Sequence, residues 1–422
     1  MRTRVPAPLI LTAAMATGLL SGCVFSALEE DLEKLQSATH IFSGTVGNGD
    51  VESREIVVVA LADTAGEEVV GFSLQYGYSD FEMRLPERPA YFFAFNDANK
   101  DLRFQADEPF AWSSNSLPVD PAQGPTDGIV IHFTAEGEPG GNMPTALVDK
   151  LLSDNLYTDL KFAIGTVSSL DNAWFAEERA RSGLWEPYAF MAEGGTGIHF
   201  LEPYDPDRIP VLFVHGINGT PRNFSSLIEN LDTDTYQAWV YNYPSGLPLD
   251  WLATGMARFL EVLHKEHRFD SLHIVAHSMG GLVSRGGINL CSEYDTCSYL
   301  RNYVTISTPW NGVDSADSGV KWAPTVVPVW RDLGPGSEYV STLFATPLPD
   351  SVPHYLLFGF RQDSIFGGGS SDGVIKLSSQ LRYEAQIHSA LVRGYDENHV
   401  SILSNPEVIE VVYNALGTST AD

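Results

Sequence analysis

The feature that most constrains the fold is a serine placed between an apolar run and a helix-prone segment. Residues 272–276 form a mainly apolar run of strand length, and a segment with helical character begins at Leu282. A serine on a sharp strand-to-helix turn has a strained backbone and tolerates only small neighbours, which here are Ala276 and Gly280. The pattern predicts that Ser278 is a catalytic nucleophile at the end of a buried strand; a plain structural turn is the alternative.

A loop earlier in the chain has the composition of an oxyanion-binding element. The apolar run 211–214 leads into a His-Gly-Ile-Asn-Gly loop, roughly 60 residues before Ser278, where the first oxyanion donor is expected. Glycines allow the backbone to approach a substrate closely. We therefore expect the backbone N–H groups of Ile217 and Met279 to form an oxyanion hole. We expect His215 to orient this loop rather than to transfer protons.

An acid and a base follow the serine in the order that such a site requires. Residues 354–360 are predicted to form a strand, and Asp372 lies on the Gly/Ser-rich loop after it. Asp372 is the expected orienting carboxylate, and Asp363 on the same loop is the alternative. Residues 385–393 are predicted to form the last strand, which delivers His399 as the general base just before a C-terminal helix.

Two other histidines near these elements are assigned packing roles. His388 lies inside the predicted last strand, so its side chain is expected to be packed. His277 precedes the serine, and adjacent strand residues point to opposite faces of a sheet. We therefore expect His277 to point away from Ser278.

The charge balance excludes several classes of partner. The chain of 422 residues has 54 acidic and 25 basic residues, which gives a formal net charge of −29. Because it has no block of Lys and Arg, it lacks the charge needed to bind nucleic acid or an anionic membrane surface. The acidity favours a soluble protein in an extracytoplasmic or saline setting. Recognition of a cationic substrate is the alternative, and no segment localises it.

The first 22 residues predict an export signal rather than part of the fold. Arg2 and Arg4 precede a mainly apolar stretch, 8–20, which is too short to span a bilayer comfortably. The stretch ends in Leu-Ser-Gly-Cys, which resembles the lipobox of bacterial lipoproteins. That resemblance implies cleavage before Cys23, its lipidation, and a place in the bacterial cell envelope, at the outer membrane or cell surface. An ordinary secretory signal with an incidental cysteine is the alternative.

The remaining two cysteines, Cys291 and Cys297, predict a structural disulfide. Their C-x5-C spacing fits no common zinc-binding pattern, and no paired histidines stand nearby. Two cysteines without another role in an exported protein usually form a disulfide with each other. We therefore expect a small disulfide-closed loop.

The N-terminal part after the signal predicts a separate β domain. Residues 23–40 are acidic and helix-prone, and we expect a spacer there. Residues 41–140 contain short β-branched and aromatic runs broken by turn residues, which is typical of a β-sandwich. This region resembles the prealbumin-type sandwich modules that precede some bacterial esterases.

One loop in that β region has the spacing of a calcium site. Asp97, Asn99, Asp101 and Glu108 occupy relative positions 1, 3, 5 and 12, which is EF-hand-type spacing. However, Leu102 stands where the turn glycine is expected, and no flanking helices are evident. A loop closed by Asx turns is the alternative. Calcium is the only ion that the sequence suggests, and no metal or organic cofactor is expected to be required for the reaction.

The remainder, residues 141–422, predicts an α/β domain. Strands alternate with helices, which indicates a largely parallel sheet covered by helices, and 146–156 is expected to be the first helix. A segment at about 313–350 carries many aromatic and aliphatic residues. It is expected either to cap an apolar acyl pocket or simply to pack as inserted helices.

Five short motifs together resemble the bacterial lipases and esterases of the α/β-hydrolase superfamily. They are the His-Gly loop, Ala-His-Ser-Met-Gly-Gly, Ser-Thr-Pro-Trp-Asn-Gly, Ser-Asp-Gly-Val and Asn-His-Val. The run 276–280 is similar to that of the small Bacillus-type lipases, although its first alanine departs from the commoner glycine. The resemblance covers about 165–415 and implies an α/β-hydrolase fold with a triad of Ser278, His399 and Asp372.

The expected function is hydrolysis of carboxylic esters through an acyl-enzyme, with a small-molecule or lipid ester as substrate. The same triad would also serve a phospholipase, a thioesterase or an acyltransferase. An inactive, surface-anchored binding protein is the alternative outside enzymes. A lid that opens at lipid interfaces would indicate a lipase and a fixed rim an esterase, and the sequence leaves both open.

Overall fold

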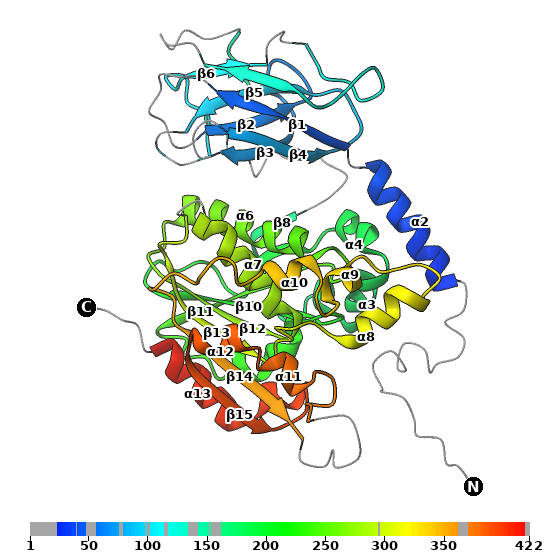
Figure 1. The fold of residues 1–422 in the computed structure, drawn as a ribbon. Coiled ribbons are helices and arrows are strands. Elements are labelled where there is room, and N and C mark those ends of the chain that lie inside the picture. The colour runs from blue at the N-terminus through cyan, green and yellow to red at the C-terminus, as the bar shows by residue number, and fades with distance from the viewer. Residues whose placement is uncertain are drawn as a thin grey trace. The chain divides into compact units, whose positions relative to one another are not determined.

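The computed structural model of the chain contains two compact units. It describes residues 23–38, 40–47, 56–75, 79–97, 99, 102–113, 117–133, 142–150, 152, 162–293, 296–361 and 370–417. The small unit spans Leu32–Lys161, and the large unit contains the chain up to Asp31 together with Phe162–Asp422 (Figure 1). In the parts described, no helix has both the length and the apolar character needed to cross a membrane.

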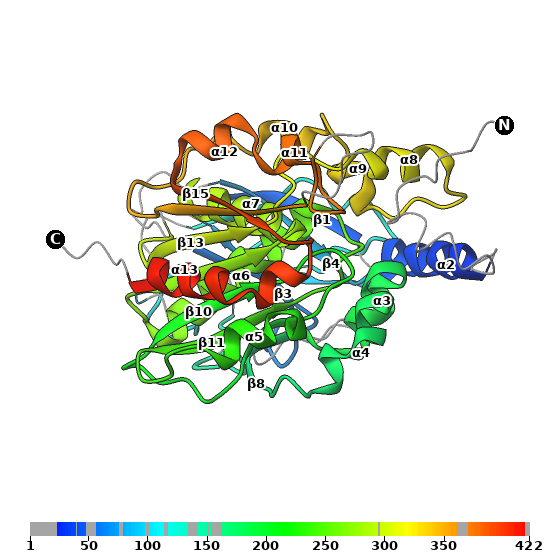
Figure 2. The same ribbon diagram turned by 90° about the horizontal axis from the view of Figure 1, so that it is seen from below.

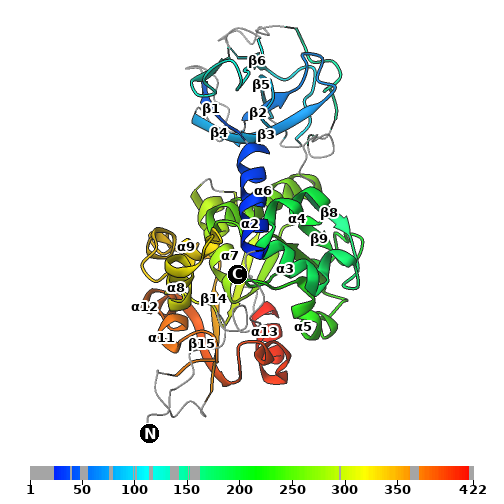
Figure 3. The same cartoon turned by 90° about the vertical axis from the view of Figure 1, so that its right-hand side faces the viewer.

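The acidic spacer forms an ordered helix, α2 (Cys23–Ala38). Its first half packs on the large unit beside α3 (Glu177–Trp185) and α4 (Pro187–Glu193), as Figure 3 shows. The buried Asp31 carboxylate accepts hydrogen bonds from the Tyr188 and Ala189 amides at 2.8 and 3.1 Å. These amides belong to the first turn of α4, where backbone N–H groups have no partner within the helix.

The small unit contains two sheets that share one core, as expected for a β-sandwich. Both sheets contribute apolar side chains to that core, among them Phe42, Met83, Phe92 and Ile131. The first sheet has the order β4 (Ser79–Leu85), β1 (His40–Gly47), β7 (Ile129–His132). The second has the order β3 (Val69–Gln75), β2 (Ile56–Leu61), β5 (Tyr91–Asn96), β6 (Phe110–Trp112).

The outer face of the second sheet is also buried, and this corrects the expected first helix of the large unit. Phe93 of β5 contacts Phe104 edge to face, with ring centroids 5.1 Å apart, and both rings are buried. Leu147 is fully buried, the Ala146 amide donates to the Ala65 carbonyl, and Val148 bridges to Phe104. Residues 146–150 therefore form turns and a bridge, and their apolar side chains belong to the small unit rather than to an amphipathic helix.

The large unit is built on an eight-stranded sheet. Every neighbouring pair is parallel except β9 and β11, and β12 in the centre is buried at all its residues, as expected for a strand covered on both faces. The order is β15 (Ser389–Asp396), β14 (His354–Phe360), β13 (Leu300–Ile306), β12 (Leu272–His277), β10 (Ile209–Val214), β11 (Tyr236–Asn242), β9 (Thr196–Phe200), β8 (Phe162–Val167).

Helices cover both faces of this sheet (Figure 2). On one face, α5 (Ser225–Glu229) and α13 (Pro406–Gly417) share a core with side chains of β10, β11 and β12. Side chains alternate along a strand, so the others point to the opposite face. There α6 (Leu249–His267) and α7 (Met279–Glu293) pack against β9, β10 and β12. The expected parallel sheet flanked by helices is therefore confirmed.

The segment at about 313–350, expected either to cap an acyl pocket or to pack as inserted helices, is helical. It contains α8 (Asp314–Trp322), α9 (Val329–Leu333) and α10 (Glu338–Thr342).

Cys291 and Cys297 form the expected disulfide, with their Cα atoms 5.4 Å apart.

The last strand starts later than expected. Residues Tyr383–Ile387 form helix α12, and β15 begins at Ser389. The sequence Tyr-Glu-Ala-Gln-Ile has three good helix formers in its centre and no period-two alternation, which explains the difference. His388 ends α12 and is exposed, so it is not the packed strand residue that the sequence predicted.

Candidate active site

Ser278 lies on the turn between β12 and α7 in a strained conformation. Its φ angle is +55°, a region that a non-glycine residue rarely adopts, and its amide donates to the Ile306 carbonyl of β13 at 2.9 Å. A Cβ atom on Gly280 would clash with the backbone oxygens of Val214 and His215. The close approach of this turn to the loop after β10 thus explains the small residues that the sequence showed.

The structure brings Ser278, His399 and Asp372 into one hydrogen-bonded chain. The Ser278 hydroxyl lies 2.9 Å from His399 Nε2, and His399 Nδ1 lies 2.6 Å from Asp372 Oδ2. Asp372 is fully buried, while Ser278 is 4% and His399 8% exposed. In the tautomer that fits both contacts, Nδ1–H donates to the carboxylate and Nε2 accepts from the hydroxyl. Nε2 is then free to take the serine proton.

The Asp372 carboxylate is held in place by backbone donors. Its Oδ1 atom accepts hydrogen bonds from the Val374 and Ile375 amides at 2.8 and 2.6 Å, which leaves Oδ2 for the imidazole. The Asp372 carbonyl also accepts from the His399 amide at 3.0 Å. Asp363, the alternative acid, lies outside the described residues.

The two amides expected to form the oxyanion hole lie at the ends of neighbouring strands. Met279 is the first residue of α7, where an amide has no partner within the helix and faces anions favourably. Ile217 follows β10, and the next residue, Asn218, is fixed because its amide donates to Ser245 Oγ at 2.9 Å. Neither the Ile217 nor the Met279 amide has a hydrogen-bond partner within the described chain.

His215 has the surroundings of a structural residue. Its ring is buried and stacks on Tyr243 with centroids 4.1 Å apart, and its Nδ1–H donates to the Gly216 carbonyl at 2.9 Å. Burial lowers the pKa of His215 to about 4, so the ring is neutral. The Tyr243 hydroxyl donates to the His215 carbonyl, a support that the sequence did not reveal.

His277 contacts the base rather than the nucleophile. Its Nε2–H donates to the backbone carbonyl of His399 at 2.7 Å, and the two rings lie 4.7 Å apart. Burial, and secondarily the proximity of His399, lowers the pKa of His277 to about 3. Its placement away from Ser278 was expected, but its contact with His399 was not, because that contact joins β12 to the loop after β15, far along the chain.

The large unit has the strand order of a known enzyme fold, and a family model described as "alpha/beta hydrolase fold" matches residues 209–336. The large unit has the α/β-hydrolase fold. The matched range begins at β10, includes the Ser278 turn and ends in the cap segment. The small unit lies outside this match.

Among individual proteins, the chain is similar to a lysosomal thioesterase of Xenopus laevis, at 24% identity over 109 residues. That match covers 24% of this chain and 36% of the thioesterase, so the chain spans only about a third of that relative's length. Solved structures with a similar fold include the mature lipase of Bacillus licheniformis, at 17% identity, with 52% of this chain and 97% of the lipase covered and a TM-score of 0.42. Lipase B of Aspergillus fumigatus matches at 16% identity over 61% of each chain, with a TM-score of 0.39.

The loop with calcium-type spacing is described in part. Asp97 is buried, and its Oδ2 accepts from the Leu102 amide at 3.1 Å. Leu102 has a φ of +57°, the conformation that the turn glycine of such a loop would adopt. Glu108 accepts from the Gln105 amide at 2.9 Å, and Asp101 lies outside the described residues. Within the described chain, no group of three His, Cys, Asp or Glu residues could hold a metal, and calcium binding stays a prediction.

Proposed function

We propose that the chain is a serine hydrolase that cleaves carboxylic esters through an acyl-enzyme on Ser278. The observation that carries this proposal is the continuous chain of hydrogen bonds from Ser278 through His399 to Asp372, at 2.9 and 2.6 Å. The strained backbone of the serine and the two oxyanion amides beside it support the same function. The reaction needs no metal, because the imidazole transfers the proton and the amides stabilise the charge.

The chemistry follows from these positions. His399 Nε2 accepts the proton of Ser278 as the serine oxygen bonds to the ester carbonyl carbon. The carbonyl oxygen becomes an oxyanion, which the Ile217 and Met279 amides stabilise. The intermediate collapses by breaking the bond to the alcohol oxygen, and His399 returns its proton to the departing alcohol. Water then attacks the acyl-enzyme with the same assistance, which releases the carboxylic acid and restores the serine.

We propose that the cap segment contacts an apolar acyl group. Trp322 at the end of α8 is 79% exposed, while Val327, Val329 and Val340 of the same segment are buried. An exposed tryptophan beside a packed apolar segment suits contact with an acyl chain. Thioesters and phospholipids present the same carbonyl to the same triad, so they are the first alternative substrates to compare.

Hydrolysis of p-nitrophenyl esters of increasing acyl length tests this function. We expect release of p-nitrophenol by the purified protein, and loss of at least about 10⁴-fold in kcat/KM in Ser278→Ala. Ser226→Ala, a partly exposed serine on α5, is the matched control and should retain full activity. Absence of hydrolysis by the folded protein on esters, thioesters and phospholipids would favour the inactive binding protein instead.

We also propose that the protein is exported and tethered by a lipid on Cys23. The support is the sequence alone: a basic start, an apolar stretch and Leu-Ser-Gly-Cys at 20–23. Growth with a radiolabelled or alkyne fatty acid should label the wild-type protein, and Cys23→Ser should abolish the label. Equal labelling of both proteins would refute lipidation at this residue.

A further inference from the structure

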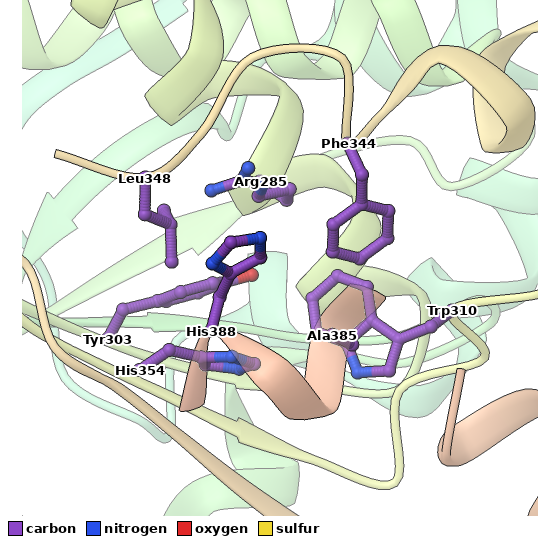
Figure 4. A pocket seen from close by; sticks show the side chains of 8 residues that line it. All are labelled: Arg285, Tyr303, Trp310, Phe344, Leu348, His354, Ala385 and His388. Carbon is purple, nitrogen blue, oxygen red and sulfur yellow. The ribbon is translucent and has the colours of Figure 1, made fainter. Parts of the chain in front are cut away.

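A small pocket lies in the α/β-hydrolase unit, away from the hydrogen bonds of the triad. Its lining comes from α7, β13, the loop after β13, the end of the cap segment, β14 and α12 (Figure 4). The residues that decide its chemistry are Arg285, Tyr303, Trp310, His354 and His388. It has room for about one particle the size of a water molecule. Neither the triad nor the oxyanion amides line it.

Arg285 is buried without a counter-charge. Its side chain is 2% exposed, and one nitrogen, Nη2, donates to the Thr346 carbonyl. Within the described chain, its Nε and Nη1 groups have no hydrogen-bond partner and no carboxylate pairs with it. Burial lowers the pKa of Arg285 to about 10, which still leaves it charged at neutral pH. Burying a cation without an anion beside it costs folding free energy, so we expect Arg285 to have a negatively charged partner.

The neighbouring Arg382, unlike Arg285, has a carboxylate that neutralises its charge. The guanidinium groups of Arg285 and Arg382 both contact the Phe344 ring, at 5.4 and 4.9 Å from its centroid. Arg382 is paired with Glu384 at 3.0 Å. Because that carboxylate is already paired with Arg382, it does not neutralise Arg285.

The other polar groups of the pocket are donors or are already satisfied. The indole Nε1–H of the buried Trp310 has no acceptor within the described chain. The Tyr303 hydroxyl donates to the Gly281 carbonyl at 2.6 Å. His354 uses both nitrogens, on Thr305 Oγ1 at 2.8 Å and Ser389 Oγ at 2.9 Å, and His388 is exposed.

We propose that this pocket binds a small monovalent anion of the halide class, with chloride as its ordinary ligand. A monatomic anion fits a water-sized space, accepts hydrogen bonds from the free N–H groups of the Arg285 guanidinium, and supplies the missing negative charge. Phosphate, sulfate and larger carboxylates would have to displace the side chains of the lining. The ligand therefore differs in class from the ester substrate proposed for Ser278.

The bound anion would stabilise an element that borders the candidate active site. Arg285 lies on α7, the helix that starts directly after Ser278. This helix packs closely on the loop after β13, because a Cβ atom on Gly281 would clash with the Thr308 side chain of that loop. Because the anion would neutralise the buried charge on α7, its removal is expected to lower stability first and activity second.

Thermal unfolding in different sodium salts tests the site in solution. We compare sodium chloride and bromide with sodium gluconate at equal ionic strength, because any salt screens the repulsion within a protein of net charge −29. We expect Tm to rise with halide concentration above the gluconate series and to saturate. Arg285→Gln should lose this rise, whereas Arg331→Gln, an exposed arginine on α9, should keep it. Identical chloride and gluconate series in the wild type would refute the proposal.

Two further measurements do not depend on the folding of Arg285→Gln. Arg285→Lys keeps the charge with fewer N–H donors, and should raise the half-saturating chloride concentration about tenfold. Wild-type crystals grown with bromide should show an anomalous peak in the pocket beside the Arg285 guanidinium. An unchanged chloride dependence in Arg285→Lys, or bromide found only at the protein surface, would overturn the site.

Discussion

Replacing Asp372 with asparagine should inactivate the enzyme without unfolding it. In the structure Oδ1 of Asp372 accepts from two backbone amides, so the oxygen of an asparagine would take this position. Its NH₂ group would then face His399 Nδ1, which lies 2.6 Å from Oδ2 in the native site. Two donors cannot face one another, so the imidazole must carry its proton on Nε2. In that tautomer Nε2 cannot accept the proton of Ser278.

We expect kcat to fall roughly 10⁴-fold, because the same tautomer change has this effect in another serine hydrolase. The loss corresponds to about 5 kcal/mol of transition-state stabilisation. The assay is steady-state hydrolysis of a p-nitrophenyl ester, with Tm measured on the same preparation. Asp350→Asn, an exposed aspartate of the cap segment, is the matched control. Retention of more than about a tenth of wild-type kcat in Asp372→Asn, or a larger loss in Asp363→Asn, would refute the assignment of the acid.

Three other predictions concern stability. Gly280→Ala should lower the free energy of unfolding by about 3 kcal/mol or more in urea denaturation, because the new Cβ would clash with backbone that cannot move aside; an unchanged midpoint would contradict this. Replacing Cys291 and Cys297 together by serine should cost about 2 kcal/mol, as expected for a disulfide between residues separated by 6 positions. Burial lowers the pKa values of His277 and His354 to about 3 from the ordinary 6.5. Below about pH 6.5 the unfolded chain therefore binds more protons than the folded chain. The free energy of unfolding should fall as the pH is lowered from about 7 to 5. In His354→Gln this fall should be smaller.

The sequence predicted the candidate site well because its parts are encoded locally. The strand, the small neighbours and the helix around Ser278 are contiguous in the sequence. The oxyanion loop is likewise contiguous with the strand that precedes it. Asp372 and His399 were found from their order along the chain and from the strands that precede them. Parallel strands carry their C-terminal ends to one edge of a sheet, so residues distant in sequence meet there.

The misplaced elements depend on contacts between distant segments. Residues 146–150 look like a helix start, yet in the small unit they form turns and a bridge to Phe104, with Leu147 buried. The start of the last strand was set too early because α12 is a short helix of only five residues directly before it. Two features arise only when strands and helices have assembled, so no local sequence pattern predicts them. They are the contact of His277 with the His399 carbonyl and the burial of Arg285 without a counter-charge.

The most direct test of the proposed mechanism is covalent labelling with an active-site phosphonate, read by mass spectrometry of the intact protein and its peptides. A serine activated by His399 should gain one phosphonate adduct, on the peptide that contains Ser278, and Ser278→Ala should gain none. A folded wild-type protein that stays unlabelled, or an adduct that persists in Ser278→Ala, would contradict the assignment of Ser278 as the nucleophile.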